Sequence, residues 1–490
     1  MKLFGKLFLC TFFIFTAAAA FCAAVNIYHT NDAHAFYYPR LIDGRLTGGY
    51  AALAGFLKQQ KKPYLLFDGG DFLAGTYEAK ETKGLLSVQL MDMLGYNAAV
   101  IGNHEGDFGE DAFFKFIDEA KFDILAANIR DAQTGLPLPK ILPYKMYEIS
   151  GKKIAVIGLA RDPLPSSKKI KTGRDITSLR KAVAEVKKYQ PDAVIVLTHS
   201  SAYEGADKKE LAYAASVARV KGIDLALGGH IHRVVSRKIN NTVFVESGGE
   251  LGGLSKIILD FDDKTGKLND IKTEYIFLDA SKYTQDEKVK QYAEKFYNKE
   301  IDRPIGTAKE RIFKRNQGKD IDSPLGNLFA DIIRQSTGAD IALQNTEGIR
   351  MDIAKGDITK RAVFDVFPFS NKVVLVKVSG DFIKTLATRA LRDSYSSFQY
   401  SGLGLKYTVK DNKPVITEML VNGQPLEGPK IYTLAVNDFN ASGRAEGHMF
   451  KNLPGKTSFG DITIRDMFLD YLKANPKGIA APPTGRVKKI

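Results

Sequence analysis

Largely apolar runs of four or five residues recur through the first half of the chain. Their length and β-branched content are typical of buried strands, and five stand out: residues 25–28, 64–67, 98–101, 193–197 and 223–227. A helix-then-strand rhythm is clearest over residues 91–101, 111–124 and 178–197. Strands that alternate with helices predict an α/β fold in which successive strand ends point the same way.

The pattern changes after residue 240, where the apolar runs become shorter and more β-like up to residue 277. A helix is then predicted over residues 286–300, with five apolar side chains on one face: Val289, Tyr292, Ala293, Phe296 and Tyr297. Because 490 residues exceed one ordinary core, we expect two or three domains. The change of pattern places two of them, at residues 25–282 and 304–490, with a linker helix at 283–303.

The second domain is predicted to open with a helix over residues 324–337. Ser323 is a suitable N-cap, and Pro324 takes the first helical position. A strand at 373–378 and a helix at 381–391 follow, and the turns at residues 411–412 and 422–423 separate further strands. The two halves are not repeats of each other, so the second domain is predicted to be a different unit of mixed strands and helices.

Polar motifs follow each of the five predicted strands of the first half. They contain five of the seven histidines, together with acids and an amide: Asp32 and His34, Asp71, Asn103 and His104, His199, and His230 and His232. In α/β sheets, ligands bind beyond the carboxyl ends of the strands, so these side chains are expected to converge. Asp, Asn and His form the mixed ligand set of a binuclear metal site, in which one carboxylate bridges two divalent ions.

The N-terminus has the layout of a secretory signal peptide over residues 1–24. Two lysines precede an apolar core and an alanine-rich end. Cleavage is expected after Ala24, with Ala20 as the alternative, and both cysteines would leave with the peptide. No later apolar run in the sequence reaches 18 residues, so we expect a periplasmic or secreted protein with no membrane span in the mature chain.

The formal net charge of +14 adds little to the prediction of substrate or partner. A basic balance favours anionic substrates through electrostatic steering, but it is also typical of a solvated lysine-rich surface. The lysines are spread along the chain and no nucleic-acid motif is found. We therefore expect a small anionic substrate and no dedicated nucleic-acid partner, and the sequence leaves the oligomeric state open.

The five motifs, in this order, resemble those of the calcineurin-like metallophosphoesterases. The second half resembles the C-terminal domain of the secreted two-domain 5′-nucleotidases in four stretches: Ser323-Pro324-Leu325-Gly326-Asn327, Gly348-Ile349-Arg350, Phe367-Pro368-Phe369-Ser370-Asn371 and Asn437-Asp438-Phe439-Asn440. The resemblance spans residues 25–485. It implies a four-layer α/β sandwich metallophosphoesterase domain, followed by a smaller α/β substrate-binding domain and hinged to it.

The resemblance also implies two divalent ions, such as zinc or manganese, with Asp71 bridging them. One ion would be held by Asp32, His34, Asp71 and His232, and the other by Asp71, Asn103, His199 and His230. His104 matches the catalytic histidine of the family, and Asp107 matches the aspartate that orients it.

In this family the second domain stacks the nucleoside base between two aromatic rings and binds phosphate with an arginine. Arg350 matches that arginine, Asn345 begins the same motif, and Phe439 matches one aromatic. Phe398 and Tyr400 are the alternatives for the other. The stretches 346–347 and 443–447 depart from the family pattern, which leaves the preferred nucleotide open.

The resemblance therefore implies a secreted binuclear-metal phosphohydrolase, namely a 5′-nucleotidase that converts a nucleoside 5′-monophosphate and water to nucleoside and phosphate. A 2′,3′-cyclic nucleotide phosphodiesterase with 3′-nucleotidase activity, a UDP-sugar hydrolase and a sulfur-oxidation thiohydrolase are alternatives with the same fold. A non-catalytic surface protein with a relic site belongs to a different class, and the intact ligand set argues against it.

Overall fold

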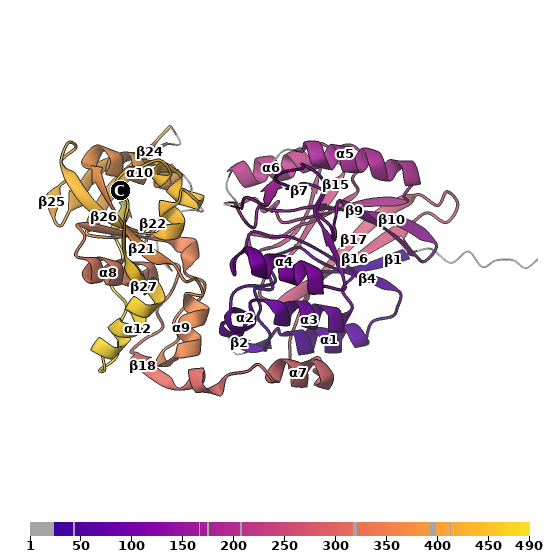
Figure 1. Ribbon diagram of the computed structural model, residues 1–490, viewed down its shortest axis with the longest axis horizontal. Helices are drawn as coiled ribbons and strands as arrows, with labels where there is room; N and C mark the ends of the chain where they lie inside the picture. The colour runs from indigo at the N-terminus through magenta and orange to yellow at the C-terminus, as the bar shows by residue number, and fades with distance from the viewer. Residues whose placement is uncertain are drawn as a thin grey trace, which may run out of the picture.

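The computed structural model describes residues 24–490, apart from residues 43–44, 166, 174–175, 206–207, 317–320, 393–397 and 412. The expected signal peptide lies outside the described residues except for Ala24, which is the first residue of β1. Figure 1 shows two bodies that face each other, joined along one side by the segment that carries α7.

The first body contains a seven-stranded sheet in the order β17-β16-β1-β4-β5-β6-β8. β1, β4, β5, β6 and β8 are parallel, whereas β16 and β17 continue the sheet antiparallel. The strands are β1 (Ala24–Thr30), β4 (Tyr64–Asp68), β5 (Ala98–Val100), β6 (Asp123–Leu125), β8 (Ile141–Leu142), β16 (Gly253–Phe261) and β17 (Leu268–Phe277).

A second sheet of six strands has the order β14-β15-β13-β12-β10-β9, in which β10, β12, β13 and β15 are parallel. Its strands are β9 (Tyr144–Ile149), β10 (Lys152–Leu159), β12 (Ala193–Thr198), β13 (Leu225–Leu227), β14 (Val234–Ile239) and β15 (Thr242–Ser247). Two short ribbons complete the β structure: β2 (Arg40–Ile42) with β3 (Arg45–Thr47), and β7 (Ile129–Asp131) with β11 (Ile170–Thr172).

The two sheets pack face to face, and helices cover both outer faces (Figure 1). Along β10, Ile154 and Val156 belong to the core that contains the first sheet, whereas Ala155 and Ile157 pack with the helices outside the second sheet. This alternation is the two-residue period of a strand buried on both faces. It confirms the four-layer α/β sandwich. The helices are α1 (Tyr50–Lys58), α2 (Tyr77–Thr82), α3 (Leu85–Leu94), α4 (Glu110–Glu119), α5 (Thr177–Val186), η1 (Lys187–Tyr189) and α6 (Lys208–Ala218).

The linker helix α7 (Glu287–Glu294) is shorter than the sequence predicts. Asp286 caps its start by accepting a hydrogen bond from the Val289 backbone N–H, and Val289 packs into the core of the first body. A separate 3₁₀ turn, η2 (Lys299–Asp302), follows because the Asn298 side chain accepts the Glu300 N–H and competes with helix continuation.

The second body is built on a five-stranded sheet in the order β22-β19-β26-β21-β27, with a four-stranded sheet, β25-β24-β23-β28, beside it. Helices α8, α9 and α12 pack on one face of the five-stranded sheet, and α10 with the smaller sheet packs on the other. The strands are β18 (Pro304–Ala308), β19 (Ile341–Asn345), β20 (Gly356–Thr359), β21 (Lys372–Ser379), β22 (Phe398–Ser401), β23 (Leu403–Lys410), β24 (Lys413–Val421), β25 (Gln424–Pro425), β26 (Ile431–Asn437), β27 (Thr457–Thr463) and β28 (Val487–Lys489).

Capping explains the best-predicted helix of this body, α8 (Pro324–Thr337). The Ser323 side chain accepts the Gly326 N–H, and Gly338 ends the helix in the left-handed conformation. The predicted boundaries are confirmed here, and those of β21 and of α10 (Gly380–Arg392) hold to within one residue. The other helices are η3 (Thr346–Gly348), α9 (Lys360–Val366), α11 (Asp438–Ala441), η4 (Ala445–Phe450) and α12 (Ile464–Ala474).

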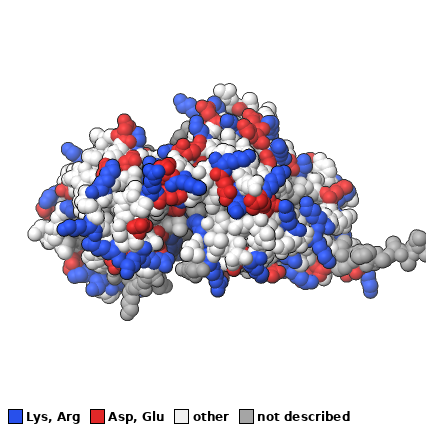
Figure 2. Space-filling model, turned by 90° about the horizontal axis from the view of Figure 1, so that it is seen from below, with Lys and Arg blue, Asp and Glu red and all other residues white. Residues whose placement is uncertain are grey.

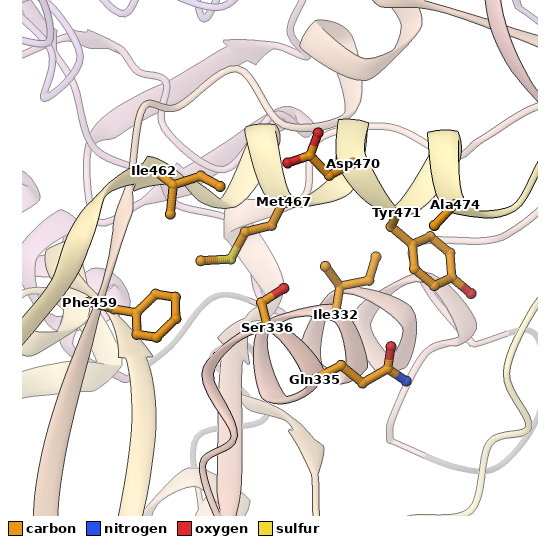
Figure 3. Close-up of a pocket in the computed structure, with 9 residues that line it drawn as sticks. All are labelled: Ile332, Gln335, Ser336, Phe459, Ile462, Met467, Asp470, Tyr471 and Ala474. Atoms are coloured by element: carbon orange, nitrogen blue, oxygen red, sulfur yellow. The ribbon is translucent and has the colours of Figure 1, made fainter.

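A cavity of about 310 Å³ lies in the second body, between α8, α12 and β27 (Figure 3). Its lining is largely apolar and includes one acid, Asp470, which pairs with Lys473. None of the predicted site residues lines it. Within the described parts of the chain, no helix has the length and apolar character needed to span a membrane.

Candidate metal centre

The polar motifs meet at the carboxyl edges of the two sheets, as the strand pattern predicts. β1, β4 and β5 are consecutive parallel neighbours in the first sheet, and β12 and β13 are neighbours in the second. The loops that follow these five strands carry Asp32 and His34, Asp71, Asn103 and His104, His199, and His230 and His232.

Asp32, His34 and His232 form one group of converging donor atoms. The Nε2 atoms of His34 and His232 lie 3.1 Å apart, and they lie 3.9 and 3.4 Å from Oδ1 of Asp32. Two imidazole nitrogens and one carboxylate oxygen around a common point are a ligand set for a divalent transition metal.

Asp71, His199 and His230 form the second group. Nε2 of His199 lies 3.0 Å from Oδ2 of Asp71, and this same oxygen lies 3.9 Å from Nε2 of His34 in the first group. Asp71 is therefore within reach of both groups, which is the arrangement that a bridging carboxylate requires.

The donor atoms of the two groups are arranged as metal ligands, and not all of them are satisfied by hydrogen bonds to one another. Oδ1 of Asp32 and Oδ1 of Asn103 are buried and have no hydrogen-bond partner among the described residues. Nδ1 of His34 donates to the Ala74 carbonyl at 2.8 Å, and Nδ1 of His199 donates to the Gly69 carbonyl at 2.7 Å. In both rings this leaves the Nε2 lone pair pointing into the cluster, as metal-binding histidines require.

The electrostatics of the cluster agree with this arrangement. Burial lowers the pKa of His34, His230 and His232 well below the usual value, which keeps these rings neutral and able to bind a cation. Burial also opposes protonation of His199, but the carboxylates of Asp71 and Asp32 raise its pKa to about 10. These carboxylates thus favour a proton on the His199 ring, and a cation bound at Nε2 would take the place of that proton.

The backbone is strained where these side chains are displayed. Five of the candidate ligands have positive φ angles of 46–88°: Asp32, His34, Asp71, His230 and His232. Left-handed backbone at a non-glycine residue costs on the order of 1 kcal/mol or more and gathers at functional sites. A Cβ at Gly102 would overlap the Asp71 carboxylate, so only glycine permits these two loops to approach so closely.

His104 and Asp107 lie beside the cluster and form a pair. Nδ1 of His104 donates to Oδ2 of Asp107 at 2.7 Å, and the backbone N–H of His104 donates to Oδ1 of Asp71 at 2.8 Å. Burial lowers the pKa of His104, but the Asp107 and Asp71 carboxylates outweigh this effect and raise the pKa above its usual value. The ring is therefore held in one orientation and favours the protonated form.

The second body contributes Arg350 and Phe369 to the site. Nη2 of Arg350 lies 3.3 Å from Nε2 of His104. The Phe369 ring stacks on the His104 ring with centroids 5.6 Å apart and an interplanar angle of 25°. A small cavity separates the two bodies here, lined by His34, Phe36, Ala74, Gly75, His232, Glu250, Arg350, Pro368 and Phe369.

Neither Asn345 nor Phe439 lines that cavity. Asn345 is buried at the end of β19, where its Oδ1 accepts a hydrogen bond from Asn437 at 2.8 Å. Phe439 is half-buried on α11, with the Arg444 guanidinium 5.6 Å from its ring centroid.

The expectation that Phe398 or Tyr400 stacks on a nucleoside base is wrong. Both side chains belong to the core between the five-stranded sheet and α10, and they are 1% and 3% exposed. They are two residues apart on β22, so both point to the same face of the sheet, which here is the buried one. Neither ring presents a free face to a ligand.

Two residues that the structure places at the site, Phe369 and Glu105, were not predicted as site residues from the sequence. Phe369 belongs to a stretch that was noted only for its resemblance to the 5′-nucleotidase C-terminal domain. An aromatic residue after Pro368 does not by itself indicate a binding site. Glu105 adjoins His104 and is 1% exposed. Its carboxylate accepts backbone N–H groups from both the Asp71 loop and Gly102. A buried acid that follows a ligand motif could have been suspected from sequence.

Comparison with known proteins agrees with this architecture. The family model for calcineurin-like phosphoesterases, a metal-dependent class, matches residues 25–234, and the model for the 5′-nucleotidase C-terminal domain matches residues 304–452. A 5′-nucleotidase of Vibrio cholerae is 27% identical over 92% of this chain and 90% of its own length.

Solved structures agree as well. A 5′-nucleotidase precursor from Thermus thermophilus superimposes with a TM-score of 0.82 at 25% identity, covering 95% of this chain and 99% of that one. A sulfate thiohydrolase from Thermus thermophilus has a TM-score of 0.78 at 18% identity, with 95% and 96% of the two chains covered, and this shows a shared fold. The chain belongs to the two-domain 5′-nucleotidase family, in which a calcineurin-like phosphoesterase domain precedes a 5′-nucleotidase C-terminal domain.

Proposed function

We propose that this protein is a 5′-nucleotidase that hydrolyses nucleoside 5′-monophosphates to nucleoside and phosphate with the help of two divalent ions. The observation that carries the proposal is the approach of Arg350 from the second body to His104 beside the metal cluster, at 3.3 Å. Arg350 can only donate, so Nε2 of His104 accepts from it in this structure. A phosphate oxygen bound between the two groups would accept from Arg350 and from protonated His104.

The two ions would be held by Asp32, His34, Asp71 and His232 and by Asp71, Asn103, His199 and His230. Zinc and manganese suit such nitrogen and oxygen donors. When bound, such a pair neutralises phosphoryl oxygens and activates water for in-line attack. The unpartnered oxygens of Asp32 and Asn103 support this assignment.

His104 would supply the proton that the leaving 5′-oxygen needs. Its Nδ1 is occupied by Asp107, so the proton on Nε2 is the one directed at the substrate. Asp107 orients the ring and stabilises its cationic form. Arg350 would bind the phosphate and fix its orientation relative to Nε2 of His104.

The nucleoside would lie between Phe439 and Phe369. Val373 pairs with Asn437 at one end of the five-stranded sheet, and Nδ2 of Asn371 donates to Oδ1 of Asp438 at 2.9 Å. These contacts hold the loop that carries Phe369 beside the helix that carries Phe439. Asn345 would support this sheet end through its bond to Asn437 rather than contact the nucleoside.

Export to the periplasm or the medium is supported by the layout of residues 1–24. We also propose that the domains span residues 25–282 and 304–490, with residues 283–303 connecting them. On the face seen in Figure 2, lysine and arginine side chains are interspersed with acids over both halves. This mixed surface supports a small-molecule substrate over a nucleic-acid partner.

The decisive experiment is a substrate panel on purified protein loaded with zinc or manganese. AMP, UMP, 3′-AMP, 2′,3′-cyclic AMP and UDP-glucose would each be assayed for kcat/KM. The highest value is expected for a nucleoside 5′-monophosphate, and Arg350→Lys should lower that value by about 10-fold or more because lysine cannot form the bidentate contact. A preference for the cyclic nucleotide or the UDP-sugar would replace the proposal by that alternative. No hydrolysis at all would support a non-catalytic protein.

A further inference from the structure

Arg465, near the start of α12, is a buried cation whose hydrogen bonds all go to one short segment. Arg465 is only 4% exposed to solvent. Nη1 donates to the carbonyl oxygens of Phe367, Pro368 and Phe369 at 3.2, 2.9 and 3.3 Å. Nη2 donates to Oγ of Ser370 at 3.4 Å.

No carboxylate forms a direct ion pair with Arg465 within the described parts of the chain, and only the charge of the neighbouring Asp466 raises its pKa. The adjacent Asp466 carboxylate is engaged instead in capping α12, where it accepts from the backbone and hydroxyl of Thr463. The guanidinium lies over the Phe364 ring, 3.9 Å from its centroid, and burial lowers the pKa of Arg465. Burying a cation without an acid is costly, so the contacts that it makes with the segment must offset that cost.

The other side of the same segment faces the metal centre. Phe369 lines the small cavity together with His34 and His232, and its ring stacks on His104. The Arg350 guanidinium lies 5.4 Å from the Phe369 centroid. The segment at residues 367–370 is therefore held by Arg465 from behind while it presents Phe369 to the site.

We propose that Arg465 is the positioning residue that fixes Phe369 over His104 and thereby sets how tightly the substrate's nucleoside is bound. The inference rests on the proposed nucleotidase function but concerns a residue outside the metal and phosphate contacts. A guanidinium suits the task because its planar, fixed donors reach three carbonyl oxygens and a hydroxyl at once, whereas a lysine ammonium acts as a single point.

The absence of tryptophan from the sequence allows a direct test of position. Phe369→Trp would introduce a single fluorescent reporter, and Arg465→Lys would be added in that background. We expect the second change to shift the emission to longer wavelength and to raise the acrylamide quenching constant, because the segment loses its anchor. Arg334→Lys is the matched control. Arg334 also donates to a backbone carbonyl, of Asp340, but does so away from the site. Equal spectra with and without Arg465 would overturn the proposal.

Kinetics test the consequence for binding. Arg465→Lys should raise KM for AMP by about 10-fold, the effect of losing one or two charge-assisted hydrogen bonds. Hydrolysis of p-nitrophenyl phosphate, which has no nucleoside, should retain its kcat/KM. Because Arg465 acts through Phe369, the KM for AMP of the double variant Arg465→Lys/Phe369→Leu should be no higher than that of Phe369→Leu alone.

Equal losses on both substrates, or additive losses in the double variant, would mean that Arg465 only stabilises the second body. The circular-dichroism melting curve of each variant establishes that it is folded before its kinetics are compared. Should the wild type hydrolyse no nucleotide, the proposed function fails, while the tryptophan measurement still decides whether Arg465 positions residue 369.

Discussion

Replacing Glu105 by glutamine changes one atom of a buried carboxylate that connects two ligand-bearing loops. Oε2 of Glu105 accepts the backbone N–H groups of Gly102 at 2.6 Å and Asp71 at 3.1 Å. Oε1 accepts those of Phe72 at 2.8 Å and Leu73 at 3.4 Å. An amide keeps one acceptor oxygen and turns the other position into a donor, so two buried N–H groups lose their acceptor.

Each buried N–H group left unsatisfied costs about 1–3 kcal/mol, so the gross cost is about 2–6 kcal/mol. Burial and then the neighbouring Asp71 raise the pKa of Glu105 to about 7, because both disfavour the charged carboxylate. The amide removes that charge and offsets part of the loss. We therefore expect the free energy of unfolding to fall by about 2 kcal/mol, the lower end of that range. For a domain of this size the Tm should then be lower by about 4–8 °C.

The assay is thermal unfolding of Glu105→Gln with and without zinc, beside elemental analysis of bound metal. Because the two loops carry Asp71 and Asn103, the stabilisation by zinc should shrink as well as the Tm of the metal-free protein. Glu110→Gln is the matched control, since the Glu110 side chain bonds to Ser167 and Lys169 instead of to the ligand-bearing loops. Wild-type Tm and metal content in Glu105→Gln would refute the reasoning.

Two further results are expected. His104→Ala should retain both ions, measured by elemental analysis, and lower kcat by roughly 10²–10⁴, the range for a lost acid–base group; loss of metal would place His104 in the coordination shell instead. Asp365→Asn should remove a pH dependence of stability. Burial raises the pKa of Asp365 to about 7, so the folded protein holds a proton that the unfolded chain has released, and wild-type stability falls as pH rises from about 4 to about 7. In denaturant titrations the free energy of unfolding of the variant should rise relative to that of the wild type as pH increases. Parallel curves of unfolding free energy against pH would show that the pKa of Asp365 is not raised by folding. The charged side chains that act on Asp365 are Arg40, Arg361, Glu78 and Glu250.

The elements best predicted from sequence were those with strong local signals. α8 has Ser323, Pro324 and Gly338 at its ends, each with a local conformational reason to be there. The linker helix was overestimated because apolar periodicity continues to Tyr297, while the Asn298 turn that follows α7 depends on a side-chain hydrogen bond that periodicity does not record.

The candidate site also has a part that the sequence predicts and a part that it does not. The metal cluster could be predicted because strand ends in a parallel sheet converge whatever lies between them in sequence. The aromatic partner could not, because Phe398, Tyr400 and Phe369 are chemically alike in sequence and differ only in burial. β22 turns the first two rings into the core, whereas Arg465, almost 100 residues beyond Phe369, holds the third at the site.

The arrangement of the two bodies has a consequence for turnover. The cavity between them measures about 10 Å³, room for about one water and far too small for a nucleotide. The bodies must therefore separate before substrate enters, which breaks the contact between Arg350 and His104 and the ion pair between Arg361 and Glu78 at 2.6 Å. Glu78 is 1% exposed in the closed form, so opening exchanges a buried ion pair for solvation of the two charges. Closure on a nucleotide restores that ion pair and gives Arg350 and His104 an anionic acceptor in place of each other, so binding energy assembles the site in which the proton is transferred.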